Sequence, residues 1–117
     1  MARFTNFHVW HEARSLLRLV SSATADMRAE GDLKSQLRRA AISVVSNIAE
    51  GCERGSDRDF RRFLMIANAS AAEVEAQATI ASDIACLDDA VSQQIIGQCQ
   101  RVGRMLNRLM ATIEART

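Results

Sequence analysis

Proline and tyrosine are both absent from this chain of 117 residues, which contains only five glycines, one tryptophan and four phenylalanines. Without proline nothing forces a break inside a helix, and so few aromatic residues leave little of the patterning typical of sheets. Hydrophobic residues make up 48% of the chain, with Ala, Leu, Ile and Val prominent among them. We therefore expect an all-α protein, and the length predicts a single domain over residues 1–117.

Long apolar runs are also missing. No stretch approaches the roughly 18 consecutive apolar residues of a membrane-spanning helix. The first 24 residues contain charges at Arg3, Glu12, Arg14 and Arg18, where a signal peptide would need an apolar segment. We expect a cytoplasmic protein without membrane contact.

Neither charge nor cysteine content points to a specialised class. The formal net charge is +1, which argues against nucleic-acid binding by the molecule as a whole. Fourteen of the fifteen basic residues are arginine, which suits bidentate pairing with carboxylates or phosphates. The three cysteines, an odd number without C-x-x-C spacing, predict reduced thiols. We expect Cys86 and Cys99 in the core and Cys52 to be the exposed thiol.

Four segments repeat apolar residues at three- and four-residue steps, the spacing of amphipathic helices. Polar residues suited to capping mark the expected helix starts: Asn6, Asp32, Ser56, and Asp88 or Asp89. The first helix should run to about Arg28, before Gly31, and the apolar stripe of the third should run to Ala85. Short connections favour antiparallel neighbours, so we predict an antiparallel up-down-up-down four-helix bundle.

The second helix has a polar face as well as an apolar one. We expect its polar residues to form a hydrogen-bonded network that fixes helix register or a subunit contact. The set comprises Arg39, Ser43, Asn47, Glu50, Gly51 and Arg54. Gly51 fits the left-handed position that closes a helix. An acid–base role for Arg39, Asn47 and Glu50 is the alternative, but no nucleophile or phosphate loop completes a mechanism, so we expect no catalytic residues and no enzyme.

The chain has more apolar positions than one buried face per helix requires. The additional ones are Ile42, Val45, Ile66, Ile80, Ile84, Ile96 and Met105. A second buried surface, formed by self-association, would account for them.

The same central stretch carries a family resemblance. Residues 38–43 and 47–51, followed by Arg54 and Ser56, resemble the signature of the small four-helix 23S rRNA intervening-sequence proteins, which include accessory variability proteins of diversity-generating retroelements. Matching positions outside this stretch are Val9, Trp10, Ala13, Phe60, Phe63, Leu64, Ala67, Ser70 and Glu73. The resemblance implies a ring of five bundles, and contact with nucleic acid or a protein that processes it.

Five arginines are the candidate nucleic-acid contacts: Arg14, Arg18, Arg101, Arg104 and Arg108. On helices they would form a strip of positive charge able to bind phosphates of RNA or DNA. The alternatives are a solvated face with local ion pairs, and a scaffold that contacts only proteins.

His8 and His11 are spaced for one metal ion, yet no third ligand is evident. We expect neither a metal nor a cofactor.

Overall fold

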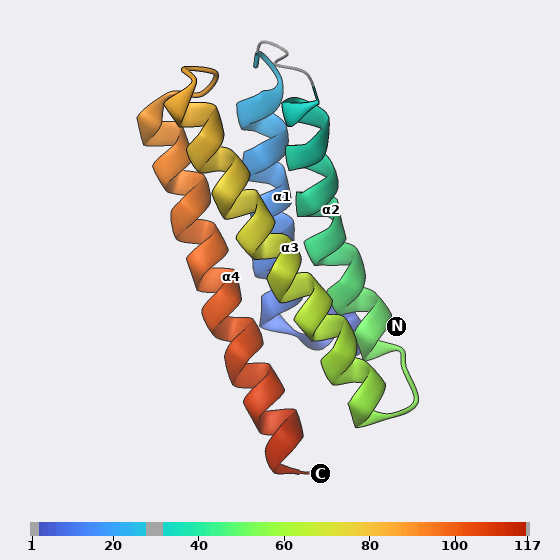
Figure 1. Cartoon of the computed structure of the whole chain (residues 1–117). Helices are drawn as coiled ribbons and strands as arrows, with labels where there is room; N and C mark the ends of the chain where they lie inside the picture. The colour runs from blue at the N-terminus through green and yellow to red at the C-terminus, as the bar shows by residue number, and fades with distance from the viewer. Residues whose placement is uncertain (1–2, 28–31, 117) are drawn as a thin grey trace.

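The computed structural model describes residues 3–27 and 32–116, which form a short 3-10 helix and four α-helices (Figure 1). Their bounds are η1 (Arg3–Asn6), α1 (His8–Thr24), α2 (Leu33–Cys52), α3 (Asp57–Asp83) and α4 (Asp89–Ala115). No strand occurs in these residues, and the predicted all-α class is confirmed.

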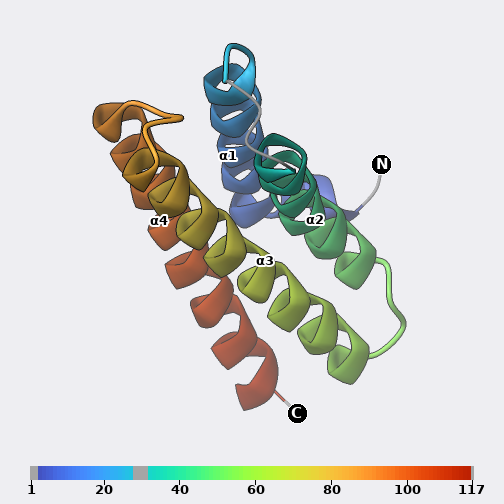
Figure 2. The same cartoon turned by 45° about the horizontal axis from the view of Figure 1, so that its top comes forward.

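The four helices form an elongated bundle with principal extents of 46 × 23 × 21 Å. Consecutive helices run in opposite directions, and α1 and α3 each pack against both α2 and α4 (Figures 1 and 2). The helix α3 therefore lies diagonally across the bundle from α1, with one side left free of other helices. This arrangement confirms the predicted up-down-up-down four-helix bundle.

The core is apolar and receives side chains from every helix. Its largest fully buried side chains are Leu16, Leu37, Ile48, Leu64, Ile95, Leu106 and Ile113. The helix α3 contributes mainly small residues, including Ala67, Ala71, Ala78 and Ala81, which let its neighbours approach closely. Buried Ser92 on α4 donates to the carbonyl oxygen of Ala78 at 2.8 Å, so this core hydroxyl is satisfied.

Some predicted helix boundaries are confirmed and others are wrong. Ser56 caps α3, accepting a hydrogen bond from the Asp59 amide, and Asp88 directly precedes α4. The predicted cap Asn6 instead ends η1, and Phe7 occupies the N-cap position of α1. The first helix ends at Thr24 rather than near Arg28. Gly31, the predicted break, lies outside the described residues, as does Arg28.

α1 ends before the predicted residue, and an arginine of α2 binds its C-terminus. Arg38 donates through Nε to the Thr24 hydroxyl at 2.8 Å and through Nη2 to the Ser21 carbonyl at 3.1 Å. A cation at a helix C-terminus satisfies carbonyl groups that have no partner within the helix. Arg38 thus serves as a tertiary cap for α1.

The end of α3 also differs from the prediction. Ala85 lies beyond the helix with a positive φ of 60°, rather than on its apolar stripe. The amide of Cys86 donates to the Ala81 carbonyl at 2.8 Å, and the amide of Ala85 donates to Ser82 at 3.0 Å. These two bonds form a Schellman motif, in which a left-handed residue ends the helix.

Candidate assembly and binding surfaces

A polar seam joins α2 to α3. The hydroxyls of Ser43 and Ser70 lie 2.8 Å apart, and Asn47 donates to the carbonyl oxygen of Ser43 at 2.8 Å and to its hydroxyl at 3.0 Å. Each group is partly buried, so these bonds favour one register of the two helices. Two members of the predicted network, Ser43 and Asn47, therefore act together.

Gln77 continues this seam toward the other end of the bundle. Its side-chain Nε2 donates to Glu73 at 3.2 Å and lies 3.4 Å from the Gln36 amide oxygen. Gln77 is 7% exposed, and its Oε1 has no hydrogen-bond partner among the described residues. Gln77 was missed as a member of this seam, although it lies seven residues beyond Ser70, on the same side of α3.

The charged members of the predicted network do not join this seam. Glu50 is exposed and pairs with Arg54 at 2.6 Å, one turn along the same helix. Arg39 is exposed and forms no ion pair or side-chain hydrogen bond with another described residue. The expected Arg39–Asn47–Glu50 network is therefore wrong within one copy of the chain, because Arg39 and Glu50 lie on the outer side of α2.

Gly51 has a different role from the predicted one. It is buried inside α2, which continues to Cys52, and its φ does not lie in the left-handed region. An added Cβ would lie 2.9 Å from the Cβ of Phe63 and 3.2 Å from a ring carbon of Phe60. Glycine is required here because α3 approaches closely, not because the helix ends.

Exposed residues of α3 form a continuous side surface, which we call the α3 outer face. It comprises Arg62, Met65, Ile66, Ala69, Ala72, Glu73, Ala76, Thr79, Ile80 and Asp83, all exposed. Met65, Ile66 and Ile80 belong to the five large hydrophobic side chains that are 39–51% exposed, together with Ile42 and Ile84. Of the seven additional apolar residues that the sequence predicted for a second surface, four are exposed: Ile42, Ile66, Ile80 and Ile84. By contrast, Val45, Ile96 and Met105 pack against the core.

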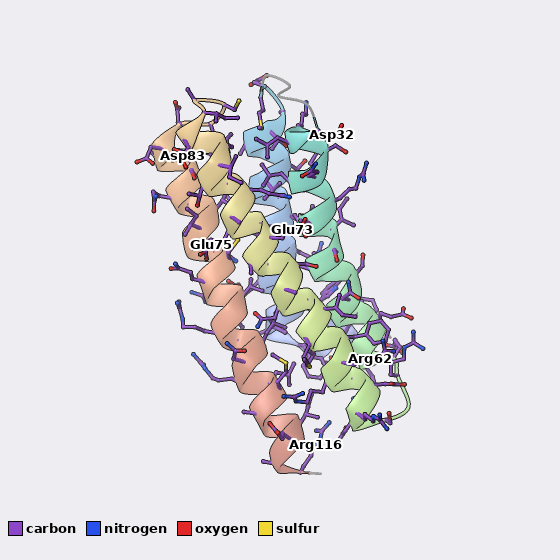
Figure 3. The ribbon with its side chains drawn as sticks, viewed as in Figure 1. Asp32, Arg62, Glu73, Glu75, Asp83 and Arg116 are labelled. Carbon is purple, nitrogen blue, oxygen red and sulfur yellow. The ribbon has the colours of Figure 1, made fainter. Side chains whose placement is uncertain are left out.

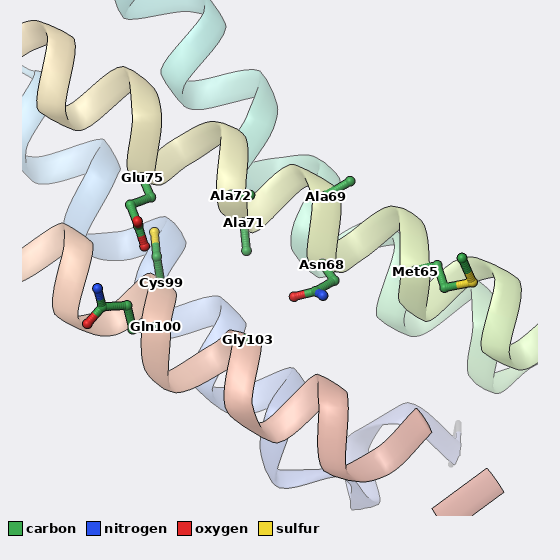
Figure 4. A pocket seen from close by; sticks show the side chains of 9 residues that line it. All are labelled: Met65, Asn68, Ala69, Ala71, Ala72, Glu75, Cys99, Gln100 and Gly103. Carbon is green, nitrogen blue, oxygen red and sulfur yellow. The ribbon is translucent and has the colours of Figure 1, made fainter. Parts of the chain in front are cut away.

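A shallow groove borders this face where α3 meets α4 (Figure 4). Its volume is about 380 Å³. Small residues form much of its lining, including Ala69, Ala72 and Gly103, while Glu75 and Gln100 lie at one end. Its lining includes two titratable groups, Glu75 and Cys99. The groove is best described as an extension of the α3 outer face.

The three arginines predicted on α4 are exposed and lie within about 60° of one another around the helix. Arg101 is the one that faces α1, since its Nε lies 2.7 Å from a carboxylate oxygen of Glu12. Gln98 donates to the same glutamate, to its backbone carbonyl at 2.9 Å. Neither Arg104 nor Arg108 forms an ion pair with a described residue.

The two arginines predicted on α1 lie elsewhere. Glu12 marks the side of α1 that faces α4, and Arg14 and Arg18 follow roughly 200° and 240° further around the helix. The Arg14 guanidinium carbon lies 4.8 Å from the ring centroid of Trp10, and Arg18 donates to the Ser15 hydroxyl at 3.1 Å. The five arginines therefore form two separate groups rather than one strip.

The histidines and cysteines form no reactive cluster. His8 and His11 are exposed, and His11 Nε2 lies 2.9 Å from the carbonyl oxygen of Thr5. No group of three or more His, Cys, Asp or Glu residues in the described part of the chain could hold a metal ion.

Within residues 3–27 and 32–116, no helix is both long enough and apolar enough to cross a membrane.

The predicted exposure of the cysteines is wrong for Cys52 and Cys86. Cys52, the last residue of α2, is fully buried, whereas Cys86, in the loop after α3, is only half-buried. Cys99 is buried, as predicted. Burial raises the pKa of Cys52 to about 11 and that of Cys99 to about 12, so neither is a ready thiolate at neutral pH.

The fold and these surfaces define a class of protein, a four-helix bundle that presents apolar and arginine-bearing sides. The family profile of the 23S rRNA-intervening sequence proteins matches residues 5–108, and the chain belongs to this family. The predicted family is thereby confirmed.

A solved structure supports the same fold. It is a protein with unknown function from the S23 ribosomal protein family of Bacteroides thetaiotaomicron, with a TM-score of 0.82 and 18% sequence identity. The similarity covers 87% of this chain and 97% of that one. At this identity it shows a shared fold alone. No curated protein sequence matches the chain.

Proposed function

We propose that this protein is a non-enzymatic scaffold that acts as an assembly of several copies of the chain. The observation that carries this proposal is the exposure of Ile42, Met65, Ile66, Ile80 and Ile84 to between 39% and 51%. Single exposed hydrophobic residues are common, but four of these five lie on or just beyond α3, and such a concentration along one helix of a small protein favours an interaction surface. Self-association buries this group in every copy.

A ring of five is the form of assembly that the family resemblance favours. In a ring each copy contacts its two neighbours through two different faces. Ile42 lies on α2 and the other four exposed hydrophobic residues lie on or just beyond α3. The apolar surface is therefore spread over two helices, which supports more than one contact per copy.

Light scattering of the purified chain at micromolar concentration tests the assembly. A pentamer of this 12.9 kDa chain has a mass of about 65 kDa. Replacing both Ile66 and Ile80 with glutamate should lower the mass while leaving the helical content intact. Ala111→Glu on the exposed side of α4 is the matched control and should leave the mass unchanged. A monomer in the unaltered protein would refute the scaffold.

Contact with RNA or DNA through α4 is the second part of the proposal. The exposed Arg104 and Arg108 support it, because no described carboxylate neutralises them. In an assembly the pair is repeated in each copy, and weak phosphate contacts then add through multivalency. Arg101 contributes less, since Glu12 already neutralises it.

Binding to generic RNA and DNA at increasing salt concentration tests this contact. The logarithm of the binding constant should fall with the logarithm of the salt concentration, with a slope of about −0.9 per phosphate neutralised on duplex DNA. Replacing Arg104 and Arg108 with glutamine should reduce both the affinity and this slope. The same change at Arg14 and Arg18 is the control with equal charge loss. Absence of binding at low salt would leave a scaffold that contacts only proteins.

A further inference from the structure

A line of exposed residues follows one side of α2. They occur at steps of three and four residues, which is the spacing of one side of an α-helix. We call this line the α2 outer strip, and its members are Ser35, Arg39, Ile42, Ser46 and Glu50, all exposed. Ile42 is its large apolar side chain and is 49% exposed. About half of this side chain therefore remains in contact with water in a single copy.

The groove between α3 and α4 has the opposite shape. Its volume of about 380 Å³ exceeds that of an isoleucine side chain, and its described lining comes from α3 and α4. Ala69, Ala72 and Gly103 leave this space open, because none of them has a side chain beyond Cβ (Figure 4). A projecting isoleucine on α2 and a depression lined by small residues elsewhere on the bundle are complementary surfaces.

We infer, on the basis of the self-association proposed above, that the α2 outer strip of one copy packs into the α3–α4 groove of the next copy, with Ile42 over Ala72. The two surfaces differ, so each copy offers both and the contact is head-to-tail. A head-to-tail contact generates a ring when its rotation closes, and a filament when it does not. This contact supplies the two different faces that the proposed ring requires.

The position of Ile42 along the bundle agrees with a ring. The hydroxyls of Ser43 and Ser70 lie 2.8 Å apart, so these two residues have the same height on the antiparallel helices α2 and α3. One step back along α2 corresponds to one step forward along α3, which places Ile42 within about 2 Å of the height of Ala72. Copies in a ring are related by rotation alone. Around an axis along the bundle, Ile42 therefore meets the groove of the next copy without a shift in height.

Charge favours the same register. Arg39 precedes Ile42 by three residues and Glu75 follows Ala72 by three, so on antiparallel helices the two charges meet when Ile42 lies over Ala72. Neither Arg39 nor Glu75 forms an ion pair with a described residue. Glu75 is the charged residue in the described lining of the groove. The contact gives each of these two charges a partner of opposite sign.

The orientation of Glu75 makes it the acceptor for this arginine. Glu73 and Glu75 lie on opposite sides of α3, with Glu75 toward α4 (Figure 3). Glu73 already accepts a hydrogen bond from Gln77 at 3.2 Å, as part of the seam with α2. The carboxylate of Glu75 instead belongs to the wall of the groove, where the strip of a second copy enters.

Charge reversal tests the pairing of Arg39 with Glu75. Arg39→Glu and Glu75→Arg should each raise the dissociation constant of the assembly about tenfold, because like charges then meet within the contact. The double variant should restore the original value, and a double variant no tighter than the two single ones would refute the pair. Arg108→Glu makes the same charge change outside the groove and should leave the constant unchanged. Analytical ultracentrifugation over a dilution series measures these constants.

Disulfide cross-linking tests the geometry of the contact. The background is Cys86→Ser with Cys99→Ala, which removes the accessible thiol and the thiol that lines the groove. A chain with both Ile42→Cys and Ala72→Cys should form a ladder of linked copies on oxidation, since the contact brings these Cα atoms within the roughly 4.4–6.8 Å of a disulfide. Either cysteine alone should leave the chain unlinked.

A chain with Ile42→Cys and Ala111→Cys is the matched control. Ala111 is exposed and lies eight residues beyond Gly103, about 12 Å along α4, so this chain should not cross-link. Dimers formed by a single cysteine variant would reveal a two-fold contact and overturn the inference. If the chain assembles but shows neither the ladder nor a response to charge reversal, this contact is refuted and the proposed self-association stands. A chain that is monomeric at high concentration refutes both proposals.

Discussion

Gly51 on α2 faces Phe63 on α3 so closely that a Cβ at Gly51 would lie 2.9 Å from the Cβ of Phe63. The carbonyl oxygen of Phe60 would be 3.2 Å away, and neither atom can move without the backbone of α3. Alanine would gain about 1 kcal/mol of helix propensity, but overpacking costs about 1–3 kcal/mol. We expect Gly51→Ala to lower the free energy of unfolding by about 1 kcal/mol, as measured by urea denaturation.

Gly97 is the matched control for this substitution. It lies inside α4, is exposed, and an added Cβ would meet no atom within 4 Å. Only the helix propensity changes at this position, so Gly97→Ala should raise the free energy of unfolding by up to about 1 kcal/mol. Equal effects at the two glycines would show that the approach of α3 to α2 is not as close as described.

Ala85 should be replaceable by glycine with a gain in stability. Its φ of 60° is costly for a residue with a Cβ, by about 1–2 kcal/mol, whereas glycine adopts this conformation freely. Glycine also has more freedom in the unfolded chain, which reduces the net gain. We expect Ala85→Gly to raise the free energy of unfolding by about 1 kcal/mol, which thermal denaturation would show as a higher midpoint. Ala111→Gly, within α4, should lower it.

The Asp57 and Arg116 pair should contribute to acid sensitivity. Arg116 donates two hydrogen bonds to the Asp57 carboxylate, at 2.9 and 2.8 Å, and they hold the pKa of Asp57 below its ordinary value of 3.8. A lowered pKa in the folded state stabilises the fold above pH 3.8, and this contribution disappears as the pH falls through the lowered value. Replacing Asp57 with asparagine should reduce the loss in free energy of unfolding that is measured as the pH falls from 5 to 2. An unchanged loss would mean that solvent screens the pair completely.

Cys86 should be the thiol that reacts in the folded protein. It is half-buried, whereas Cys52 and Cys99 are buried in the core with raised pKa values. A thiol reagent at pH 8 should modify one cysteine rapidly, and Cys86→Ser should remove this reaction. In urea all three should react. Rapid modification of Cys52 in the folded chain would contradict its complete burial.

Glu50 should contribute little to the stability of a single copy. It is exposed and its pair with Arg54 lies within one helix, an arrangement worth about 0.3–0.5 kcal/mol. Glu50→Ala should therefore shift the urea midpoint only slightly and should not unfold the chain. Thermal and chemical denaturation of the variant measure this. A large loss of stability would place Glu50 in a buried contact formed between copies.

Helix number and order follow directly from the amino-acid sequence. The apolar period and the cap at Ser56 predicted the four-helix bundle, because an amphipathic helix has one way to bury its apolar side. The excess of apolar residues was also visible, and Ile42, Ile66, Ile80 and Ile84 are exposed as a second surface would require. Local patterns determine these features because each depends on residues within a few turns of one another.

Only the tertiary structure decided which polar residues meet. Glu50 and Arg39 share a helical period with Asn47, yet the angle at which α3 approaches α2 leaves both charges in water and pairs Ser43 with Ser70. The same approach makes Gly51 a contact residue instead of a helix terminator. Arg101 pairs with Glu12, although 89 positions separate them in sequence. Such relationships depend on how neighbouring helices rotate and approach, which helical periodicity alone does not specify.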